Sequence, residues 1–380
     1  MTEKFTPPAS GAFRGIRIVD FTNVVAGPYA TRWLADMGAE VIKIESSEGD
    51  YLRSQPPIRD GHSTYFGHLN SGKTSVLLDL KNPQDVEDVK KLIATADIVV
   101  ENFRPGVMRK FGLDYDTLAA GHPRLIYCSI SGYGQTGPRA ESPAYAQTVH
   151  AESGYELANL RYQHELTRPA NSVFFFGDVL GATFAFGAIN AALYEREKTG
   201  RGQAVDVALM DSLMNLMPYD FQEAQFPAKV SRPVYRPLRT SDGFIIAIPN
   251  TQRNFIQMAK AMGHEEWLTD ERFKDVKARY GHFNELMETL EEWTLPRTSD
   301  ACIEILQANS VPCAQYRTLA EAIKDPQFEA RGSFQKVSDD AGDYLIANLP
   351  FKLSASDVFV RSHVPDLGES RIADLLKTKG

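Results

Sequence analysis

Cysteine is scarce in this sequence: Cys128, Cys302 and Cys313 are the only cysteines among 380 residues, and no two lie close together. This number and spacing argue against a disulfide framework and against a cysteine-based zinc site, and they fit reduced thiols. The histidines also lack the close pairing that is typical of metal sites. We therefore expect a cytoplasmic protein without a metal centre.

Positive charge is also in short supply, because 49 acidic residues outnumber 41 lysines and arginines and give a formal net charge of −8. A general nucleic-acid or membrane-surface binder would carry a basic field, so neither partner is expected. Residues 1–13 contain no apolar stretch of the kind found in signal peptides. The long apolar run at residues 173–193 contains Asp178 and Asn190, which favours a buried core helix over a membrane span.

Three familiar motifs are absent from the sequence, although two of them have partial matches. Residues 18–45 have the strand–turn–helix outline of a dinucleotide site, but the turn reads NVVAGP instead of GxGxxG, which argues against NAD(P) binding. Residues 70–75, NSGKTS, contain GKT without the first glycine or the spacing of a P-loop, and we interpret them as a loop before a strand. The nucleophile elbow GxSxG is absent.

What the sequence does have is an alternation of strand-like and helical segments. This pattern predicts parallel βαβ units, and therefore an α/β fold with a Rossmann-like, doubly wound sheet. Helices are expected at residues 27–39 and 83–96, and an apolar helix is expected after Asp178. The expected strands are GIRIVDFT (15–22), EVIKIES (40–46), TSVLLDL (74–80), DIVVENF (97–103), RLIYCSISGYG (124–134) and QAVDVALMD (203–211).

The chain is longer than one compact core usually holds, which indicates a second domain. The pattern changes after about Asp211, where a proline-rich connection begins. We expect a large discontinuous domain at residues 1–222 and 328–380, and a smaller α+β domain at 223–327. Within the smaller domain a helix is expected around NFIQMAKAMG, and another from Ser299 leading to VPCAQYR.

Asp178 stands out because it is the one acidic residue near the front of the apolar run VFFFGDVLGATFAFGAINAAL. An aspartate at such a position is typical of a helix N-cap. A carboxylate held at a helix terminus in a mostly dry site can also act as a nucleophile. The two interpretations are compatible.

Several motifs occur together in a fixed order, and as a set they closely resemble the class III CoA-transferases, the CaiB/BaiF family that includes formyl-CoA transferase and carnitine CoA-transferase. The likeness runs from Gly15 to Ser212 and resumes near residue 311 and at the C-terminal LGESRIADLL. The motifs are DFTNVVAGPYATRWLADMGAEVIKIES, GDYLR, NSGKTSVLLDLK, ADIVVENFRPGVMRKFGLDY, PRLIYCSISGYGQTGP, PAYAQ, GDVLGA and REKTGRGQAVDVALMDS.

The resemblance implies an interlocked homodimer and an exchange of CoA between an acyl-CoA and a small carboxylic acid, with no tightly bound cofactor. It implies that Asp178 is the nucleophile and forms an aspartyl anhydride and then an aspartyl-CoA thioester. The positions it assigns to CoA binding are Val25, Arg53, Leu78, Asn102, Phe103, Arg104, Lys110 and Tyr145. Arg104 and Lys110 suit phosphates, and Leu78 and Phe103 suit an adenine.

Some positions depart from formyl-CoA transferase: Asn23, Val25, Ser46 and Pro143 replace a His, a Gln, an Arg and a Lys. These changes argue against formyl-CoA and oxalate as substrates. The expected glycine-rich loop is not recognisable either. Arg232, Arg236 and Arg239 either bind a substrate carboxylate or form a solvated basic linker.

Two alternatives remain open. A 2-methylacyl-CoA racemase of the same fold needs an acid/base pair, usually with a histidine, and Tyr145 occupies that position here. His150 is five residues further on and is expected to face elsewhere. A non-catalytic acyl-CoA-binding relative is disfavoured by the presence of Asp178.

Overall fold

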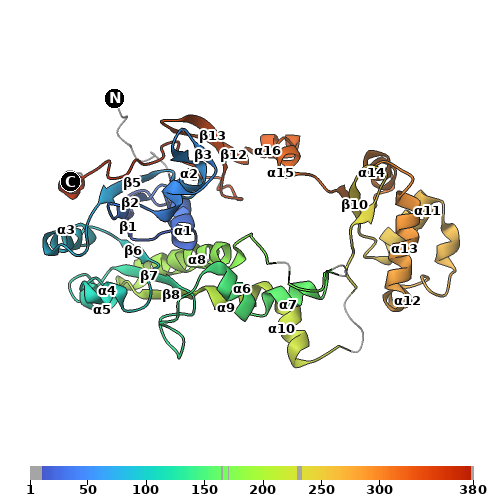
Figure 1. Ribbon diagram of the computed structural model, residues 1–380, viewed down its shortest axis with the longest axis horizontal. Coiled ribbons are helices and arrows are strands. Elements are labelled where there is room, and N and C mark those ends of the chain that lie inside the picture. The colour runs from blue at the N-terminus through green and yellow to red at the C-terminus, as the bar shows by residue number, and fades with distance from the viewer. Residues whose placement is uncertain (1–10, 164–165, 170, 229–232, 378–380) are drawn as a thin grey trace. The chain divides into compact units, whose positions relative to one another are not determined.

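The computed structural model describes residues 11–163, 166–169, 171–228 and 233–377 of the chain (Figure 1). It divides into two compact units: Met1–Phe221 with Gln327–Gly380, and Gln222–Pro326. These boundaries lie one residue from the expected ones at 222 and 328. The first unit is therefore built from both ends of the sequence, and the second is an insertion.

A six-stranded parallel sheet forms the centre of the first unit, in the order β5-β2-β1-β6-β7-β8. The order reverses between β1 and β6, which lie side by side, so this is a doubly wound sheet as predicted. The bounds are β1 Arg17–Asp20, β2 Glu40–Glu45, β5 Lys73–Leu77, β6 Ile98–Glu101, β7 Ile126–Ser131 and β8 Ala204–Ala208.

Helices cover both faces of this sheet. Alternate residues of the strands, such as Ile18 and Val19, face opposite sides and enter two separate hydrophobic clusters. On the Ile18 side lie α1 (Ala26–Asp36), α6 (Ala146–Glu152), α8 (Phe176–Thr199) and α9 (Leu209–Leu216). On the Val19 side lie α3 (Pro83–Ile93), α4 (Val107–Lys110), α5 (Tyr115–Ala119) and α17 (Ile372–Leu375).

Helix α8 has the length and apolar composition of a membrane span. In this fold it packs against α1, β7 and β8, and Ala182, Ala185 and Ile189 are fully buried. Its small residues allow close approach, because a Cβ on Gly181 would lie 2.4 Å from the Leu209 side chain. The interpretation of this run as a core helix fits that packing.

Further elements extend the first unit beside the start of α1. They form a third cluster that contains Val25, Phe66, Leu69 and Ile346. The bounds are η1 Tyr51–Ser54, β3 Ile58–Arg59, β4 His62–Ser63, α2 Thr64–Asn70, and the antiparallel hairpin β12 Phe334–Asp339 and β13 Gly342–Ala347. Two further helices, α7 Tyr155–Leu160 and α16 Pro326–Arg331, contribute no residue to this cluster, and α16 begins at the last residue of the second unit.

The second unit has its own core around Phe255, Leu290 and Trp293. A three-stranded antiparallel sheet, β11-β10-β9, lies against helices. The bounds are α10 Pro218–Gln225, β9 Leu238–Arg239, β10 Phe244–Ala247, α11 Gln252–Met262, η2 Glu265–Leu268, α12 Val276–Gly281, α13 Phe283–Thr294, α14 Ser299–Ala308, β11 Cys313–Gln315 and α15 Leu319–Ala322, with α10 crossing the boundary between the units.

Two local expectations differ from the structure. The connection expected after Asp211 begins with helices α9 and α10, because apolar residues such as Leu213 pack on the core. The helix that begins at Ser299 ends at Ala308, and the VPCAQYR stretch contributes strand β11, which pairs with β10.

Candidate functional site

Asp178 lies in the first turn of α8, not at its N-cap. The helix begins two residues earlier, at Phe176, and its N-cap is Phe175, which makes no side-chain capping bond. The prediction of an aspartate cap is therefore wrong in position. The first turn still places the carboxylate near the positive end of the helix dipole.

The start of α1 meets the start of α8 at this carboxylate. The backbone N–H of Ala26, the first residue of α1, donates a hydrogen bond to Asp178. Burial raises the pKa of Asp178 to about 6, and the N–H groups of Ala26 and of Asp178 itself oppose that shift. The result is a carboxylate that is ionised at neutral pH and poorly solvated, which is the state that a nucleophile requires.

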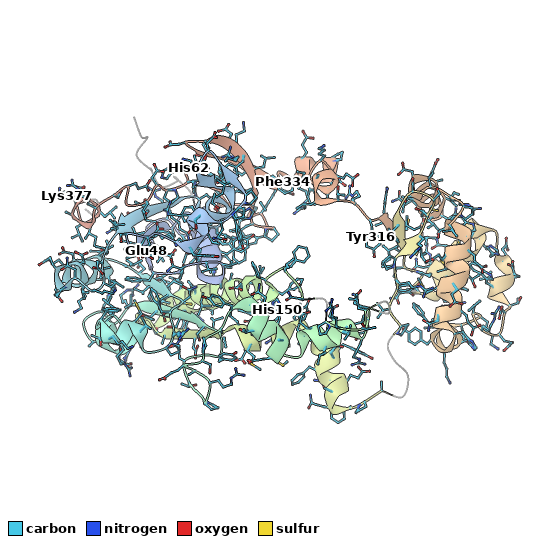
Figure 2. All side chains as sticks on the ribbon, viewed as in Figure 1. Glu48, His62, His150, Tyr316, Phe334 and Lys377 are labelled. Carbon is cyan, nitrogen blue, oxygen red and sulfur yellow. The ribbon has the colours of Figure 1, made fainter. Side chains whose placement is uncertain are left out.

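A buried histidine and a buried glutamate hold the segment that leads to Asp178. Nε2 of His150, on α6, accepts a hydrogen bond from the Gly177 N–H at 3.1 Å. Oε1 of Glu156 accepts the Ser172 N–H at 2.9 Å and lies 3.6 Å from Nδ1 of His150. Both ends of the segment are thus fixed, and Figure 2 labels His150 near the helices that it joins.

The sequence did not single out His150 for this role; it was expected only to face away from the racemase position. In the structure it is fully buried, and burial lowers its pKa, so the imidazole is neutral. A neutral ring can accept at Nε2 only if its proton is on Nδ1, on the Glu156 side. His150 and Glu156 lie on two short helices, and their spacing in the sequence does not predict that they come together.

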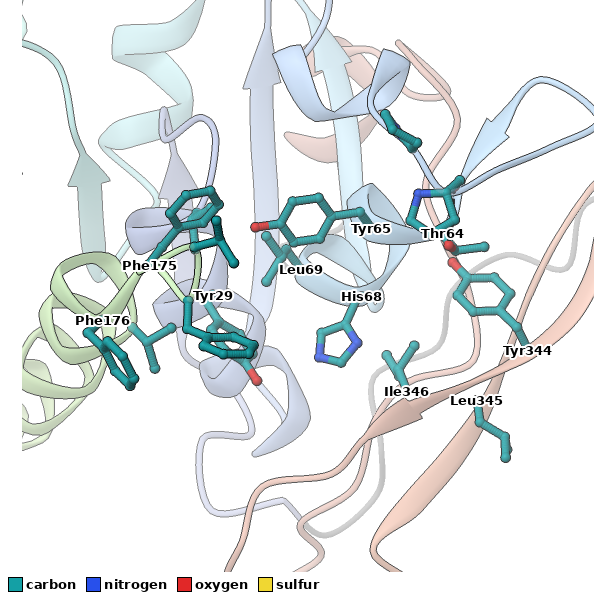
Figure 3. Close-up of a pocket in the computed structure, with 16 residues that line it drawn as sticks. Tyr29, Thr64, Tyr65, His68, Leu69, Phe175, Phe176, Tyr344, Leu345 and Ile346 are labelled. Carbon is teal, nitrogen blue, oxygen red and sulfur yellow. Dashed lines mark hydrogen bonds between the residues drawn. The ribbon is translucent and has the colours of Figure 1, made fainter. Parts of the chain in front are cut away.

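A cavity of about 740 Å³ opens beside Asp178 (Figure 3). Its wall includes Val25 before Ala26, and Phe175, Phe176 and Val179 around Asp178. Tyr65, from α2, points its hydroxyl toward Phe175. The pKa of Tyr65 is raised to about 12, by burial and by the charge of Asp178, which places this hydroxyl within reach of the carboxylate's field.

The carboxyl ends of β1 and β6 form the crevice where a doubly wound sheet binds its ligand. Asn102, after β6, is paired there with the backbone of Asn23, after β1. The Asn23 N–H donates to Oδ1 of Asn102 at 2.9 Å, and the Asn102 amide donates back to the Asn23 carbonyl at 2.8 Å. Asn102 therefore fixes the loop that leads to Val25 and Ala26.

Some of the other positions expected to bind CoA lie near this edge of the sheet, and others already make contacts within the fold. Leu78 and Phe103 are half-buried and pack on the same hydrophobic cluster. Arg104 and Lys110 are both exposed, Arg104 in the loop after β6 and Lys110 at the end of α4. Phe103 and Arg104 follow Asn102 directly, so they lie beside the crevice.

Arg53 is engaged inside the fold. Its guanidinium forms a two-pronged pair with Glu45, at 2.9 and 2.7 Å, and donates to the Pro365 carbonyl at 3.0 Å. It also lies over the ring of Phe66, with 3.9 Å to the centroid. These contacts use most of its donors, so a structural role describes Arg53 better than phosphate binding does.

Tyr145 lies at the N-cap of α6, and 71% of its surface is exposed. Its backbone N–H donates a hydrogen bond to the Thr148 hydroxyl at 3.0 Å. Its ring is therefore available to a ligand, as expected for a residue near a thioester arm. Its helix carries His150, so the same element connects it to the Asp178 segment.

Two lysines that no motif assigned are fully buried beneath the β1–α1 loop. Lys43 donates to the Thr22 carbonyl at 2.7 Å and to Asp50 at 2.9 Å, and Lys73 donates to Asp20 at 3.0 Å. Asp50 in turn accepts the N–H of Val24, which has a positive φ of 69°. NSGKTS was expected to be a loop, but its lysine, Lys73, begins strand β5.

Arg236 and Arg239 belong to the second unit, where Arg239 is exposed at the end of β9. Arg232 lies outside the described residues. Across residues 11–377, less the gaps given above, no group of three or more His, Cys, Asp or Glu residues has the geometry to hold a metal ion.

Comparison with known proteins places this geometry in a family. The model of CoA-transferase family III matches residues 13–371. The chain is 32% identical to succinate–glutarate CoA-transferase of Agrobacterium fabrum, over 96% of this chain and 94% of that protein. It is 33% identical to acetyl-CoA:oxalate CoA-transferase of Acetobacter aceti, over 98% and 97%.

A solved structure agrees. A CAIB/BAIF family protein from Brucella suis superposes with a TM-score of 0.83 at 32% identity, covering 97% of this chain and 99% of that one. The fold and site thus define a CoA-transferase. The chain belongs to CoA-transferase family III, as the sequence motifs predicted.

Proposed function

We propose that this enzyme moves CoA from an acyl-CoA to a carboxylic acid through covalent intermediates on Asp178. The observation that carries the proposal is the Asp178 carboxylate itself: partly buried, held by the Ala26 N–H, and flanked by a cavity. Poor solvation keeps such an oxygen reactive, and the fixed N–H orients it.

In the first half of the proposed reaction, an Asp178 oxygen attacks the thioester carbonyl, the C–S bond breaks, and CoA leaves as a thiolate. The thiolate then attacks the aspartyl carbonyl of the mixed anhydride. The C–O bond breaks, the donor acid leaves as a carboxylate, and Asp178 carries CoA as a thioester. Each step exchanges one acyl bond for another, so the thioester energy is conserved.

In the second half, the acceptor carboxylate attacks the Asp178 thioester and releases the thiolate. The thiolate attacks the acceptor carbonyl of the new anhydride, which gives the product acyl-CoA and regenerates the Asp178 carboxylate. No step transfers a proton, because every nucleophile and leaving group is an anion. We infer that the Ala26 N–H stabilises the oxygen of the aspartyl carbonyl as thiolate attacks.

CoA itself is proposed to lie along the carboxyl edge of the sheet. Leu78 and Phe103 provide apolar contacts for the adenine, and Arg104 and Lys110 offset the phosphate charge. Val25 and Tyr145 are proposed to contact the thioester arm. Asn102 is proposed to act by holding the Asn23 loop in place, as its two hydrogen bonds support.

The racemase alternative needs an acid/base group free to reach the α-carbon. His150 lies closer to Asp178 than the sequence indicated, but its Nε2 is occupied by the Gly177 N–H. This engagement, together with a transfer sequence that needs no proton carrier, supports the transferase.

We further propose that the chain acts as a homodimer in the cytoplasm. Helix α8 supports the homodimer because Phe184, within its apolar run, is 42% exposed, and Tyr194, at the start of its charged last turns, is 66% exposed. Exposed aromatic side chains on a core element are typical of subunit interfaces. Light scattering of the purified protein measures this directly, and a monomeric mass would contradict it.

The mechanism is tested by intact mass spectrometry of the full chain after incubation with a panel of acyl-CoAs. A CoA-sized adduct, or a hydroxamate formed with hydroxylamine and mapped to Asp178, is expected in the wild type and not in Asp178→Asn. Exchange of the α-proton with deuterated water, without any adduct, would instead establish the racemase.

A further inference from the structure

The cavity beside Asp178 has an unusual wall for an enzyme whose relatives are named for succinate, glutarate and oxalate. Its wall is mostly aromatic and aliphatic side chains. Three aromatic residues point their rings toward it in Figure 3: Tyr29 from α1, Tyr65 from α2 and Phe175 before α8. Leu69 and Ile346 also line it.

No charged side chain is present among the residues that line this cavity, all of which belong to the described part of the chain. The histidine that lines it, His68, is neutral, because burial and the nearby Arg32 lower its pKa to about 4. The hydroxyls of Tyr29 and Tyr65 stay protonated, since burial raises the pKa of both. A second carboxylate placed here would find no cation on the wall itself, because the guanidinium of Arg32, 5.9 Å from the Tyr29 ring, is already paired with Asp36 at 3.0 Å. Burial of an unpaired charge is strongly unfavourable.

The cavity lies close to Asp178: this residue does not itself line the wall, but its charge acts on Tyr65, which does. Phe175, Phe176 and Val179 surround Asp178 in the sequence and all three line the wall, as does Val25 before the Ala26 N–H. The chain of an acyl group held against the Asp178 oxygen is therefore within reach of this apolar space. A volume of about 740 Å³ lies within the usual range of ligand sites and far exceeds what a formyl or oxalyl group fills.

We propose that this cavity receives the acyl chain, and that the acid transferred is a monocarboxylic acid with an apolar aliphatic or aromatic chain. The inference rests on the proposed function and narrows its substrate class. It distinguishes this enzyme from relatives named for dicarboxylic acids. The walls of Tyr29, Tyr65 and Phe175 provide the contact surface, and the Asp178 carboxylate meets the single carboxyl carbon.

The test compares matched acyl-CoAs on the purified full chain: butyryl-CoA against succinyl-CoA, and phenylacetyl-CoA against glutaryl-CoA. The readout is exchange of the isotopically labelled free acid into its own acyl-CoA, with Asp178→Asn as the blank. A kcat/KM at least about 100-fold higher for the monocarboxylic member of each pair is expected, because a buried unpaired charge costs several kcal/mol. Equal or greater exchange with succinyl-CoA would overturn the inference.

A variant pair locates the effect. Val179 lines the cavity and is 39% exposed, so that Val179→Lys places a cation in the wall without burying it fully. The succinyl-to-butyryl ratio is expected to rise at least tenfold. Val276→Lys, at an exposed valine of α12 that does not line the cavity, is the matched control and is expected to leave the ratio unchanged. The same ratio in both variants would contradict the placement of the acyl chain.

Failure of the substrate class and failure of the mechanism are distinguishable. If no acid exchanges and no adduct forms in the wild type, the proposed transfer itself is wrong. If exchange depends on Asp178 but favours the dicarboxylic acids, only the substrate class is wrong. If Val179→Lys changes the oligomeric state of the protein while the wild type favours succinyl-CoA, the cavity is a contact between two copies of the chain, and the inference is overturned.

Discussion

Nε2 of His150 accepts the backbone N–H of Gly177 at 3.1 Å, one residue before Asp178. This contact satisfies one of the free N–H groups that every helix has in its first turn. It also ties α6 to the start of α8. The residue that we propose as the nucleophile is thus held from the side by an imidazole to which the proposed mechanism gives no chemical step.

Replacing His150 tests this positioning role. His150→Phe fills similar space but cannot accept the Gly177 N–H, so we expect kcat to fall about 10- to 100-fold, with a loss of about 1–3 kcal/mol in unfolding free energy. His150→Gln supplies an amide oxygen as acceptor and is expected to recover most of the activity. Steady-state kinetics and chemical denaturation measure both quantities.

The same pair of variants separates positioning from general acid/base chemistry. A positioning residue predicts that His150→Gln keeps the wild-type pH profile, whereas loss of a proton carrier would remove one limb of it. Equal loss of activity in His150→Phe and His150→Gln would contradict the positioning role.

The pKa of about 6 at Asp178 predicts an acid limit for activity. In the proposed mechanism the nucleophile is the carboxylate, so kcat/KM is expected to decline tenfold per pH unit below about pH 6 and to stay constant above about pH 7. Rates of labelled-acid exchange between pH 4.5 and 8 measure this. Activity that stays constant down to pH 4.5 would exclude an Asp178 pKa near 6.

Ionised Asp178 also destabilises the fold at neutral pH, because its pKa is higher in the folded protein than in the unfolded chain. The folded protein binds this proton more tightly than the unfolded chain, so the stability present below about pH 4 is lost as pH rises through about 6. Asp178→Asn is therefore expected to stabilise the fold at pH 7.5, by at most about 3 kcal/mol for a shift of about two units.

Urea denaturation at two pH values checks this expectation. The gain from Asp178→Asn should shrink to less than about 1 kcal/mol near pH 4 and disappear near pH 3, because the unfolded carboxyl has an ordinary pKa of 3.8 and is protonated in both states only below that value. A variant that is less stable than the wild type at pH 7.5 would contradict the raised pKa.

Arg104 and Lys110 are exposed, and for them the expected effect is on binding. Arg104→Ala and Lys110→Ala should each raise KM for acyl-CoA about 5- to 20-fold with little change in kcat, because a charge-assisted contact to phosphate is lost. Arg109→Ala, on the same helix as Lys110 but paired with Asp116 at 2.9 Å, is the matched control. The effect should weaken at high salt. A fall in kcat without a change in KM would argue against phosphate binding.

Lys43 and Asp50 form a fully buried ion pair beneath the β1–α1 loop. Lys43→Met leaves the Asp50 charge without its partner, so we expect a loss of about 3–5 kcal/mol in unfolding free energy. Lys90→Met removes an exposed pair with Glu87 and should cost less than about 1 kcal/mol. Thermal or urea unfolding compares the two. Similar losses would contradict the structural role of the buried pair.

The sequence predicted much of the fold because its signals are local. Alternating residues such as Ile18 and Val19 face opposite sides of the sheet, and this period of two is visible in the chain. Asp178 could also be found from the sequence, because it is a single carboxylate in an apolar run. Its exact place in the helix could not be predicted, because α8 begins at Phe176 through packing of aromatic residues and the His150 contact.

The rest of the site depends on contacts between distant residues. Lys43 has its partners in Thr22 and Asp50, and Glu156 meets Ser172 only after two short helices have packed. The positive charge of Arg53 in a family motif suggested that this residue binds CoA, yet Arg53 forms an ion pair with Glu45 inside the fold. Such pairings leave no periodic trace in a sequence.

The large unit takes strand β13 from the far end of the chain, after the whole of Gln222–Pro326. Ile346 on this strand closes the cavity whose opposite wall contains Tyr29. During synthesis, Asp178 and the sheet therefore emerge long before the cavity beside them can be complete. A chain released anywhere within the inserted unit would carry Asp178 with its cavity unfinished. If the proposed mechanism holds, the order of translation therefore delays catalytic competence until the fold is nearly made.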